Sequence, residues 1–207
     1  MQETDLCYPA DACPFCAIAA AYPDPHSQYH SRPRLWTKKR SQEEELQDAV
    51  PAEEECNVEK TSPSSFLVMR TRDVVAFLDI LPMTGGHLLV TTRNHKVKVA
   101  DMEAQESREI GFWLPFLART VAKVTGVTDY NIVQNNGARA AQVVPHVHFH
   151  IIPRPATMPE IKSKSWTMFG RGQRDDLDDE EGAQMAGEMR KVLRQEIKKL
   201  GKNDPKL

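Results

Sequence analysis

The stretch of sequence that decides the fold is Pro145-His146-Val147-His148-Phe149-His150-Ile151-Ile152-Pro153-Arg154. Three histidines alternate there with apolar residues, and side chains alternate between the two faces of a β-strand. The pattern therefore predicts a strand over residues 144–152, with the imidazoles on one face and Val147, Phe149 and Ile151 in the core. Three of the chain's seven histidines fall at a period of two, which indicates a site rather than an ordinary wet face. From this pattern alone, a metal site and a site with a nucleophilic imidazole are equally open.

The residues outside this stretch predict four more strands and two helices. Apolar and β-branched runs predict strands at 66–69, 74–78, 87–92 and 131–134. Apolar residues at helical spacing predict a long helix over 110–124, with Asp101 as its N-cap and a kink or break at Pro115. A similar pattern over 177–200 predicts a C-terminal helix. The fold class is therefore α+β: a five-stranded, mostly antiparallel sheet with a long helix between the third and fourth strands and a helix at the end.

The chain divides into four segments by composition. Residues 1–22 hold a Cys-x-x-Cys pair and belong to the folded domain, and residues 23–65 are polar and charge-segregated. We expect 23–65 to be a flexible insertion, with at most a helical turn in its acidic part. Residues 66–160 form the core of the domain, and 161–207 a C-terminal extension. In that extension, Trp166 and Phe169 are candidates for closing over a ligand or packing on a partner subunit.

Composition excludes several classes of function. No apolar run approaches the roughly 20 residues of a membrane span, and the first residues lack the features of a secretory signal. A net charge of −2 with a pI near 6.4 argues against an electrostatic nucleic-acid binder. Four cysteines in 207 residues are too few for a disulfide scaffold. We therefore expect an intracellular protein, cytoplasmic or nuclear, with no membrane or nucleic-acid partner.

Three blocks of sequence together resemble the histidine triad (HIT) superfamily. Residues 146–152 fit its signature, His-φ-His-φ-His-φ-φ with φ apolar, at every position. The polar loop Asn135-Asn136-Gly137 to Gln142 resembles the loop that precedes the triad. Residues 77–82, followed by 86–90 and His95, look like a further block of the family. The matches cover 13–18 and 66–154 in the correct order, and they imply a HIT-like fold.

The resemblance implies hydrolysis or transfer at the α-phosphate of a purine (adenine) nucleotide through a covalent nucleotidyl-histidine on His148. Nucleoside phosphoramidates and dinucleoside polyphosphates are the candidate substrates. A neutral imidazole, whose pKa is near 6.5, is a good nucleophile near neutral pH. By the family pattern His150 donates to the phosphate oxygens, and His87 matches a histidine near the active site. Val143 departs from the pattern, because many members carry Ser or Thr there to assist the leaving group.

The nucleotide pocket can also be carried over by position. The residues that match are Asn135 and Gln142 at the phosphates or ribose, Asp79 at the ribose hydroxyls, and Phe15, Ile18, Phe77 and Ile80 at the base. A carboxylate accepts hydrogen bonds without donating, which suits a cis-diol. For the four apolar residues, simple core packing is the alternative, because apolar pockets and cores look alike in sequence. For Asp79 the alternative is a turn residue before a proline.

The pair Cys13-Pro14-Phe15-Cys16 could bind a metal, act in redox chemistry or be incidental. The βαβ context of a thioredoxin-like motif is missing. One branch of the family carries the same pair and binds structural zinc. This resemblance implies a zinc site of Cys13, Cys16, His95 and His146, with two thiolates and two imidazoles suited to tetrahedral zinc. It also implies a homodimer, joined in the region of the long helix that carries Trp113.

Two functions from other classes stay open. One is an AMP-binding regulatory protein with little turnover. The other is a metalloenzyme that uses the three histidines of the triad as metal ligands. The second predicts that metal content falls when His148 is replaced, whereas the family reading predicts that His148→Ala keeps its zinc and Cys13→Ala loses it.

Overall fold

The computed structural model describes residues 12–27, 41–157 and 176–203. Within them the chain forms a five-stranded sheet, with every neighbouring pair antiparallel and the strand order β1-β2-β3-β5-β4. The strands are β1 (Leu67–Arg70), β2 (Val74–Leu78), β3 (Leu88–Thr92), β4 (Tyr130–Gln134) and β5 (His148–Pro153). The α+β class and the antiparallel sheet that the sequence predicts are confirmed. The triad strand, however, begins at His148 rather than at residue 144, so His146 lies before it.

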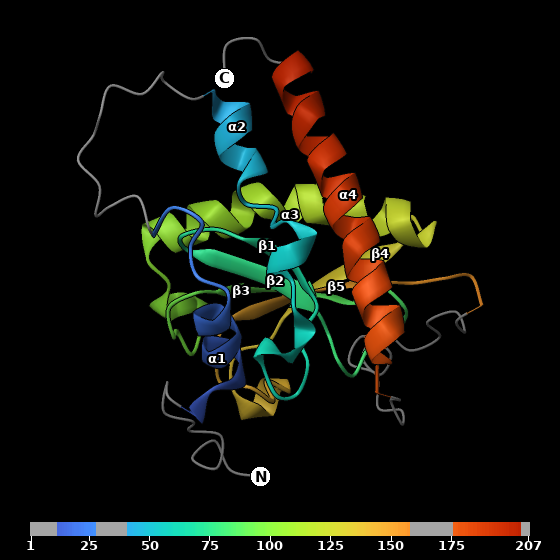
Figure 1. Cartoon of the computed structure of the whole chain (residues 1–207). Helices are drawn as coiled ribbons and strands as arrows, with labels where there is room; N and C mark the ends of the chain where they lie inside the picture. The colour runs from blue at the N-terminus through green and yellow to red at the C-terminus, as the bar shows by residue number, and fades with distance from the viewer. Residues whose placement is uncertain (1–11, 28–40, 158–175, 204–207) are drawn as a thin grey trace.

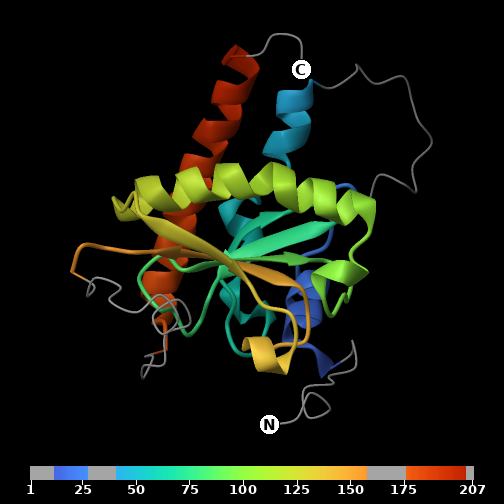
Figure 2. The same ribbon diagram turned by 180° about the vertical axis from the view of Figure 1, so that it is seen from behind.

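Each face of the sheet is covered by helices (Figures 1 and 2). On one face lie α3 (Ala104–Thr125) and α4 (Asp179–Asn203), which share a core with Val74, Ala76 and Leu78 of β2. On the other face lies α1 (Pro14–Ala21), which packs on Val75 and Phe77 of the same strand. Because both faces are buried, β2 is apolar throughout instead of alternating.

The register of β3 and β5 divides the triad strand between these two faces. His150 pairs with Leu89 and His148 with Thr91, while Phe149 pairs with Val90. Directly paired residues of antiparallel strands point to the same face. Leu89 belongs to the α1 side and Val90 to the α3 and α4 side. The two histidines therefore face α1, and the alternation predicted from the sequence holds for residues 148–151.

For the long helix α3, the sequence predicts an N-cap at Asp101 and a kink or break at Pro115. Residues Val99–Asp101 form a separate 3-10 turn, so Asp101 is not the N-cap. Glu103 takes that place, and the carboxylate of Glu106 accepts a hydrogen bond from its backbone N–H at 2.8 Å. Pro115 lies inside the helix, which continues through it to Thr125, so of the two predicted outcomes the break is wrong and the kink stays a prediction.

Ion pairs fix α4 to α3. The carboxylate of Glu196 on α4 is buried and contacts Lys123, Arg119 and Lys199. Burial alone would raise the pKa of Glu196, but the hydrogen bonds and charges of Lys123 and Lys199 lower it to about 2. A carboxylate so stabilised in the folded state adds to stability at neutral pH.

Residues 41–65 are more regular than the predicted flexible insertion. The short helix α2 (Gln42–Gln47) begins at a capping box, in which Ser41 and Glu44 bond each other's backbone N–H. Gln47 donates to the carbonyl of Arg194 on α4 at 3.0 Å. Arg190 of α4 pairs with Glu53. Ala49 and Val50 of the segment are also buried in the main core. The polar anchors belong to a distant helix, so local composition did not reveal them.

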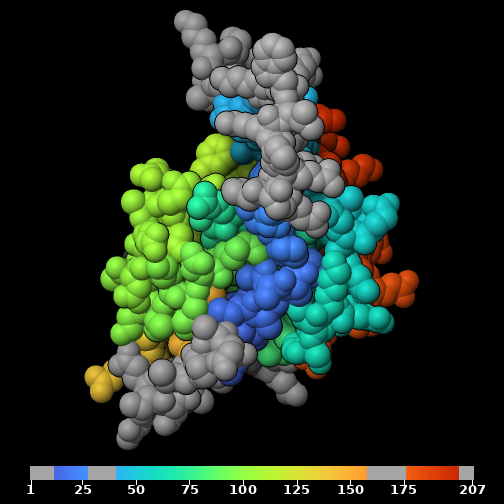
Figure 3. Space-filling model, turned by 60° about the vertical axis from the view of Figure 1, so that its left-hand side comes forward, coloured from blue at the N-terminus to red at the C-terminus, as the bar shows by residue number. Residues whose placement is uncertain are grey.

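The same segment also lies along α1 on the molecular surface (Figure 3). The hydroxyl of Tyr22, which is fully buried, donates to the carbonyl of Asn57 at 2.8 Å. Residues 28–40 of the expected insertion, and the residues Trp166 and Phe169, lie outside the described residues. None of the described helices combines the length and apolar character needed to cross a membrane.

Candidate active site and metal centre

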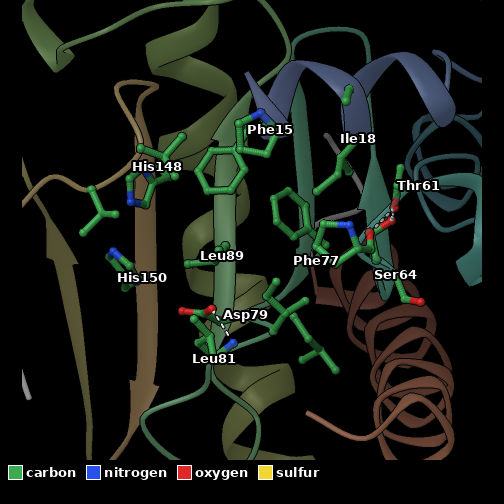
Figure 4. Close-up of a pocket in the computed structure, with 18 of the residues that line it drawn as sticks. Phe15, Ile18, Thr61, Ser64, Phe77, Asp79, Leu81, Leu89, His148 and His150 are labelled. Carbon is green, nitrogen blue, oxygen red and sulfur yellow. Dashed lines mark hydrogen bonds between the residues drawn. The ribbon is translucent and has the colours of Figure 1, made fainter. Parts of the chain in front are cut away.

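A cavity of about 410 Å³ opens between α1 and the sheet (Figure 4). It runs from His148 and His150 on β5, past Phe15 and Phe77, towards Thr61 and Ser64. Its walls are mainly apolar, and the polar groups lie towards its ends. The structure brings these predicted residues to its lining: Phe15, Ile18, Phe77, Asp79, Ile80, Asn135, His148 and His150. A largely apolar cavity with a few converging polar groups is the usual form of a small-molecule site.

The tautomer of His148 is set by a backbone carbonyl. Its Nδ1 lies 2.6 Å from the carbonyl oxygen of His146, which can only accept a hydrogen bond. Nδ1 therefore carries the proton, and Nε2 keeps a lone pair. Burial lowers the pKa of His148 below its ordinary value, so the ring is neutral at pH 7. His148 thus offers the unprotonated ring nitrogen that a nucleophile needs.

His150 is the opposite tautomer to His148, with its proton on Nε2, and two consecutive hydrogen bonds determine this. The backbone N–H of Met83 donates to Nδ1 of His87 at 3.2 Å, so the proton of His87 is on Nε2. That nitrogen lies 2.9 Å from Nδ1 of His150 and donates to it. His150 must then carry its proton on Nε2. One histidine of the pair presents a lone pair and its neighbour presents a donor.

His87 is the middle member of this series of contacts, and Asp79 lies next to it. His87 is buried, with 1% of its surface exposed, and does not line the cavity. Its Nδ1 lies 3.3 Å from a carboxylate oxygen of Asp79, so a protonated His87 would still direct Nε2–H at His150. Asp79 itself lines the cavity, and its other oxygen accepts from the backbone N–H of Leu81 at 3.0 Å. The structure therefore places His87 behind His150, outside the cavity lining.

The polar loop before the triad places its residues differently. Asn135 lines the cavity and donates to the carbonyl of Ala141 at 3.3 Å. Gln142, buried outside the cavity lining, donates to the carbonyl of Val97 at 2.7 Å and accepts from Gly137 at 2.6 Å. Its amide braces the loop. Val143 lines the cavity with 70% of its surface exposed.

The four residues of the expected metal site converge on the α1 side of the sheet. Their ligand atoms all lie within 4.8 Å of one another. Nδ1 of His146 is 3.4 Å from Sγ of Cys13 and 3.5 Å from Sγ of Cys16, and Nδ1 of His95 is 3.3 Å from Cys16. Tetrahedral zinc with its usual bond lengths separates S and N ligands by about 3.5 Å. The spacing therefore fits zinc without rearrangement.

The surroundings of these four residues also fit a metal. Nε2 of His146 donates to the carbonyl of Thr92 at 2.8 Å, which leaves Nδ1 as a ligand. Burial lowers the pKa of His146 to about 4, so the ring is neutral and able to coordinate. Burial and the neighbouring Cys13 raise the pKa of Cys16 to about 12. Two thiolates this close need a cation to remain deprotonated together, so metal affinity should rise with pH.

The triad does not form a joint metal site among the described residues. His146 groups with the cysteines, and His148 belongs to no group of three ligands. Asp79, His87 and His150 also have ligand atoms within 4.8 Å. In that group Nε2 of His87 lies 2.9 Å from Nδ1 of His150, so a cation held by these two rings would have to replace their hydrogen bond. This arrangement does not favour a metalloenzyme that uses all three triad histidines.

Known proteins share both the sequence and the fold. The HIT domain family matches residues 60–157. Adenosine 5'-monophosphoramidase hnt1 of Schizosaccharomyces pombe is 40% identical over 100 residues, which cover 48% of this chain and 72% of that protein. This chain belongs to the HIT family. The enzyme HNT1 of Saccharomyces cerevisiae, also an adenosine 5'-monophosphoramidase, is 37% identical over 48% of this chain and 60% of its own length.

Among solved structures, a Zn-bound histidine triad family protein from Mycobacterium smegmatis aligns with a TM-score of 0.55. The alignment covers 95% of this chain and 100% of that one, at 19% identity. At this identity the likeness shows the fold alone. It extends the shared fold well beyond the region matched by sequence.

Several groups of the site could not be named from the sequence. Thr92 and Met83 act through backbone atoms, which no residue type reveals. Thr61 and Ser64 line the far end of the cavity but belong to the segment expected to be flexible. Leu89 was assigned to a strand, and its place in the cavity wall depends on the β3–β5 register.

Proposed function

We propose that this HIT family member hydrolyses purine, chiefly adenine, nucleoside phosphoramidates through a covalent nucleotidyl-histidine on His148. The observation that carries the proposal is the pair of opposite tautomers on one strand. His148 presents a lone pair, and His150 a hydrogen-bond donor, at the same end of an apolar cavity. The names of the relatives favour a phosphoramidate over a dinucleoside polyphosphate.

The reaction follows from these two rings. Nε2 of His148 attacks the α-phosphorus, the P–N bond to the leaving amine breaks, and the amine nitrogen takes a proton from solvent. His150 donates to the phosphate oxygens, whose charge changes during transfer. Water then attacks the phosphorus, breaks its bond to His148 and releases AMP. The attacking water of this second step returns a proton to solvent.

The cavity determines how the nucleotide lies in this proposal. With the phosphate at the histidines, the carboxylate of Asp79 accepts the ribose hydroxyls, and Asn135 contacts the ribose or phosphate. The base lies between Phe15, Ile18, Phe77 and Ile80. Gln142 supports the phosphate side indirectly, through the loop that it braces.

Zinc is the metal proposed for Cys13, Cys16, His95 and His146. Four protein ligands would close its coordination shell, so zinc would tie α1 to the sheet and leave phosphoryl transfer to the histidines. Reduced thiols at this site suit an intracellular compartment.

A homodimer is also part of the proposal. β4 is an edge strand, and its residues Tyr130 and Ile132 are 42% and 44% exposed. Exposed apolar residues on a sheet edge favour pairing with another copy. Trp113 is buried in the core, so it is not the contact residue. Sedimentation of the purified chain tests this pairing.

Activity on two substrates tests the proposed function. The purified protein is incubated with adenosine 5'-phosphoramidate and with diadenosine tetraphosphate, and AMP release is followed by chromatography. We expect the phosphoramidate to be preferred, His148→Ala to abolish AMP release, and this variant to keep its zinc. Cys13→Ala should lose zinc. Tight AMP binding without turnover would instead support a regulatory protein, and activity that follows metal content but not His148 would refute the nucleotidyl-histidine.

A further inference from the structure

The segment from Cys13 to Cys16 carries two of the four proposed metal ligands and part of the cavity wall. Phe15 lies between the two cysteines and lines the cavity. Its ring packs edge-to-face on Phe77 and His148, with centroids 5.4 Å and 5.1 Å away. It also contacts the ring of His146, one of the four metal-site residues, at 5.9 Å. A shift of this segment would therefore change the wall of the nucleotide site directly.

His146 makes a second connection between the two sites. Its ring belongs to the metal group, and its carbonyl accepts the hydrogen bond that sets the tautomer of His148. The ring is held from the opposite side by the carbonyl of Thr92. A ligand that fixes this ring also fixes the peptide that orients the nucleophile.

The two ends of α1 are held in different ways. Arg93 donates to the carbonyls of Ala19 and Tyr22, which anchors the C-terminal end. Cys13 at the N-cap makes no side-chain capping bond, so polar anchoring there comes from the contacts of the metal group. Without a cation, the turn that carries Phe15 would keep its apolar contacts and the weak thiol–imidazole contacts, in place of four metal–ligand bonds.

We propose that metal binding at Cys13, Cys16, His95 and His146 and nucleotide binding in the cavity are thermodynamically coupled, with Phe15 as the main link. The inference rests on the proposed nucleotide site. Coupling between two sites is reciprocal, so the metal should tighten AMP binding by the same factor by which AMP tightens metal binding. Allosteric couplings are typically 5- to 150-fold, and direct contact through one ring predicts a factor of at least about 5.

Competition with a chromophoric zinc chelator measures the coupling without using activity. The zinc-loaded protein is titrated with chelator at rising AMP concentrations, and zinc release is read from the absorbance of the chelator. Calorimetry gives AMP affinity in the zinc-loaded and zinc-stripped states, and circular dichroism checks the fold. Phe15→Ala tests the link. Ile80→Ala is its matched control, because Ile80 also lines the cavity but lies outside α1. Cys56→Ser is the control for a thiol outside the metal group.

We expect saturating AMP to raise apparent zinc affinity by about fivefold or more in the native chain, with a plateau. The factor should persist in Ile80→Ala and Cys56→Ser and fall towards 1 in Phe15→Ala. Equal AMP affinity with and without zinc would overturn the coupling and leave the proposed function standing. Coupling that survives in Phe15→Ala would overturn Phe15 as the main link. Coupling that rises with AMP without a plateau would indicate that AMP acts on overall folding, and would overturn the proposal. No AMP binding in either state would refute the proposed function itself.

Discussion

His87 offers the sharpest test of how the site works. If His87 directs the tautomer of His150, then His87→Leu should impair catalysis. This substitution replaces the imidazole with an apolar side chain of similar size. The variant removes the donor 2.9 Å from Nδ1 of His150. His150 then either keeps its tautomer without this hydrogen bond, or moves its proton to Nδ1 and loses its donor towards the phosphate. His150 is only partly buried, so the lost hydrogen bond is worth about 0.5–1.5 kcal/mol, which corresponds to about 2- to 12-fold in kcat/KM.

His87→Gln separates positioning from packing. The side-chain amide of Gln can donate to Nδ1 of His150, so this variant should recover most of the activity lost in His87→Leu. Steady-state AMP release from adenosine 5'-phosphoramidate gives kcat and KM, while melting temperature and zinc content confirm that each variant is folded and loaded. Native activity in a folded His87→Leu variant would refute the reasoning, as would equal impairment of the two variants.

Three further predictions concern stability and the leaving group. The pKa of Glu196 is about 2 in the folded chain against an ordinary 4.5, so its stabilisation is present above about pH 4.5 and is lost as the pH falls towards 2; urea midpoints at pH 5 and 3 should differ less in Glu196→Gln than in the native chain. Gly182→Ala would place Cβ 2.7 Å from the ring of buried Phe66 and should cost about 1–3 kcal/mol, whereas Gly111→Ala, with open space on α3, should stabilise by about 0.5–1 kcal/mol in the same melting experiment. Val143→Ser adds a hydroxyl at the cavity mouth and should raise kcat/KM about 2- to 12-fold for phosphoramidates with a basic leaving amine; an equal effect for all leaving groups would count against a role at the leaving atom.

Apolar runs were sufficient to predict the strands of the sheet, and the period of two was sufficient to predict the faces of β5. The apolar runs of β1, β2 and β3 are continuous because both faces of the sheet are covered, and they were still recognisable as strands. Pro115 misled because the rule against proline in helices is a local preference, and the packing of Trp113 and Leu117 in the core favours a continuous helix. Burial of these side chains in the core outweighs the local preference against proline in a helix.

The segment 41–65 was misjudged for a different reason. It is poor in aliphatic residues, and its structure depends on partners more than 100 residues away, such as Arg190 and Arg194. Composition reports how much apolar surface a segment can bury by itself. It does not report ion pairs and backbone hydrogen bonds supplied by a helix at the other end of the chain.

The site residues could be placed from motif positions, but their roles depend on backbone groups. His146, His148 and His150 are the same residue type at equal spacing in one stretch. The carbonyl of Thr92 leaves a lone pair on Nδ1 of the first, the proposed metal ligand, and the carbonyl of His146 leaves a lone pair on Nε2 of the second, the proposed nucleophile. The N–H of Met83, acting through His87, makes the third a donor. Each of these three backbone groups can only donate or only accept a hydrogen bond. A substitution that keeps the three histidines but moves the loop around Met83 should therefore impair catalysis about as much as His87→Leu, because both act on the tautomer of His150.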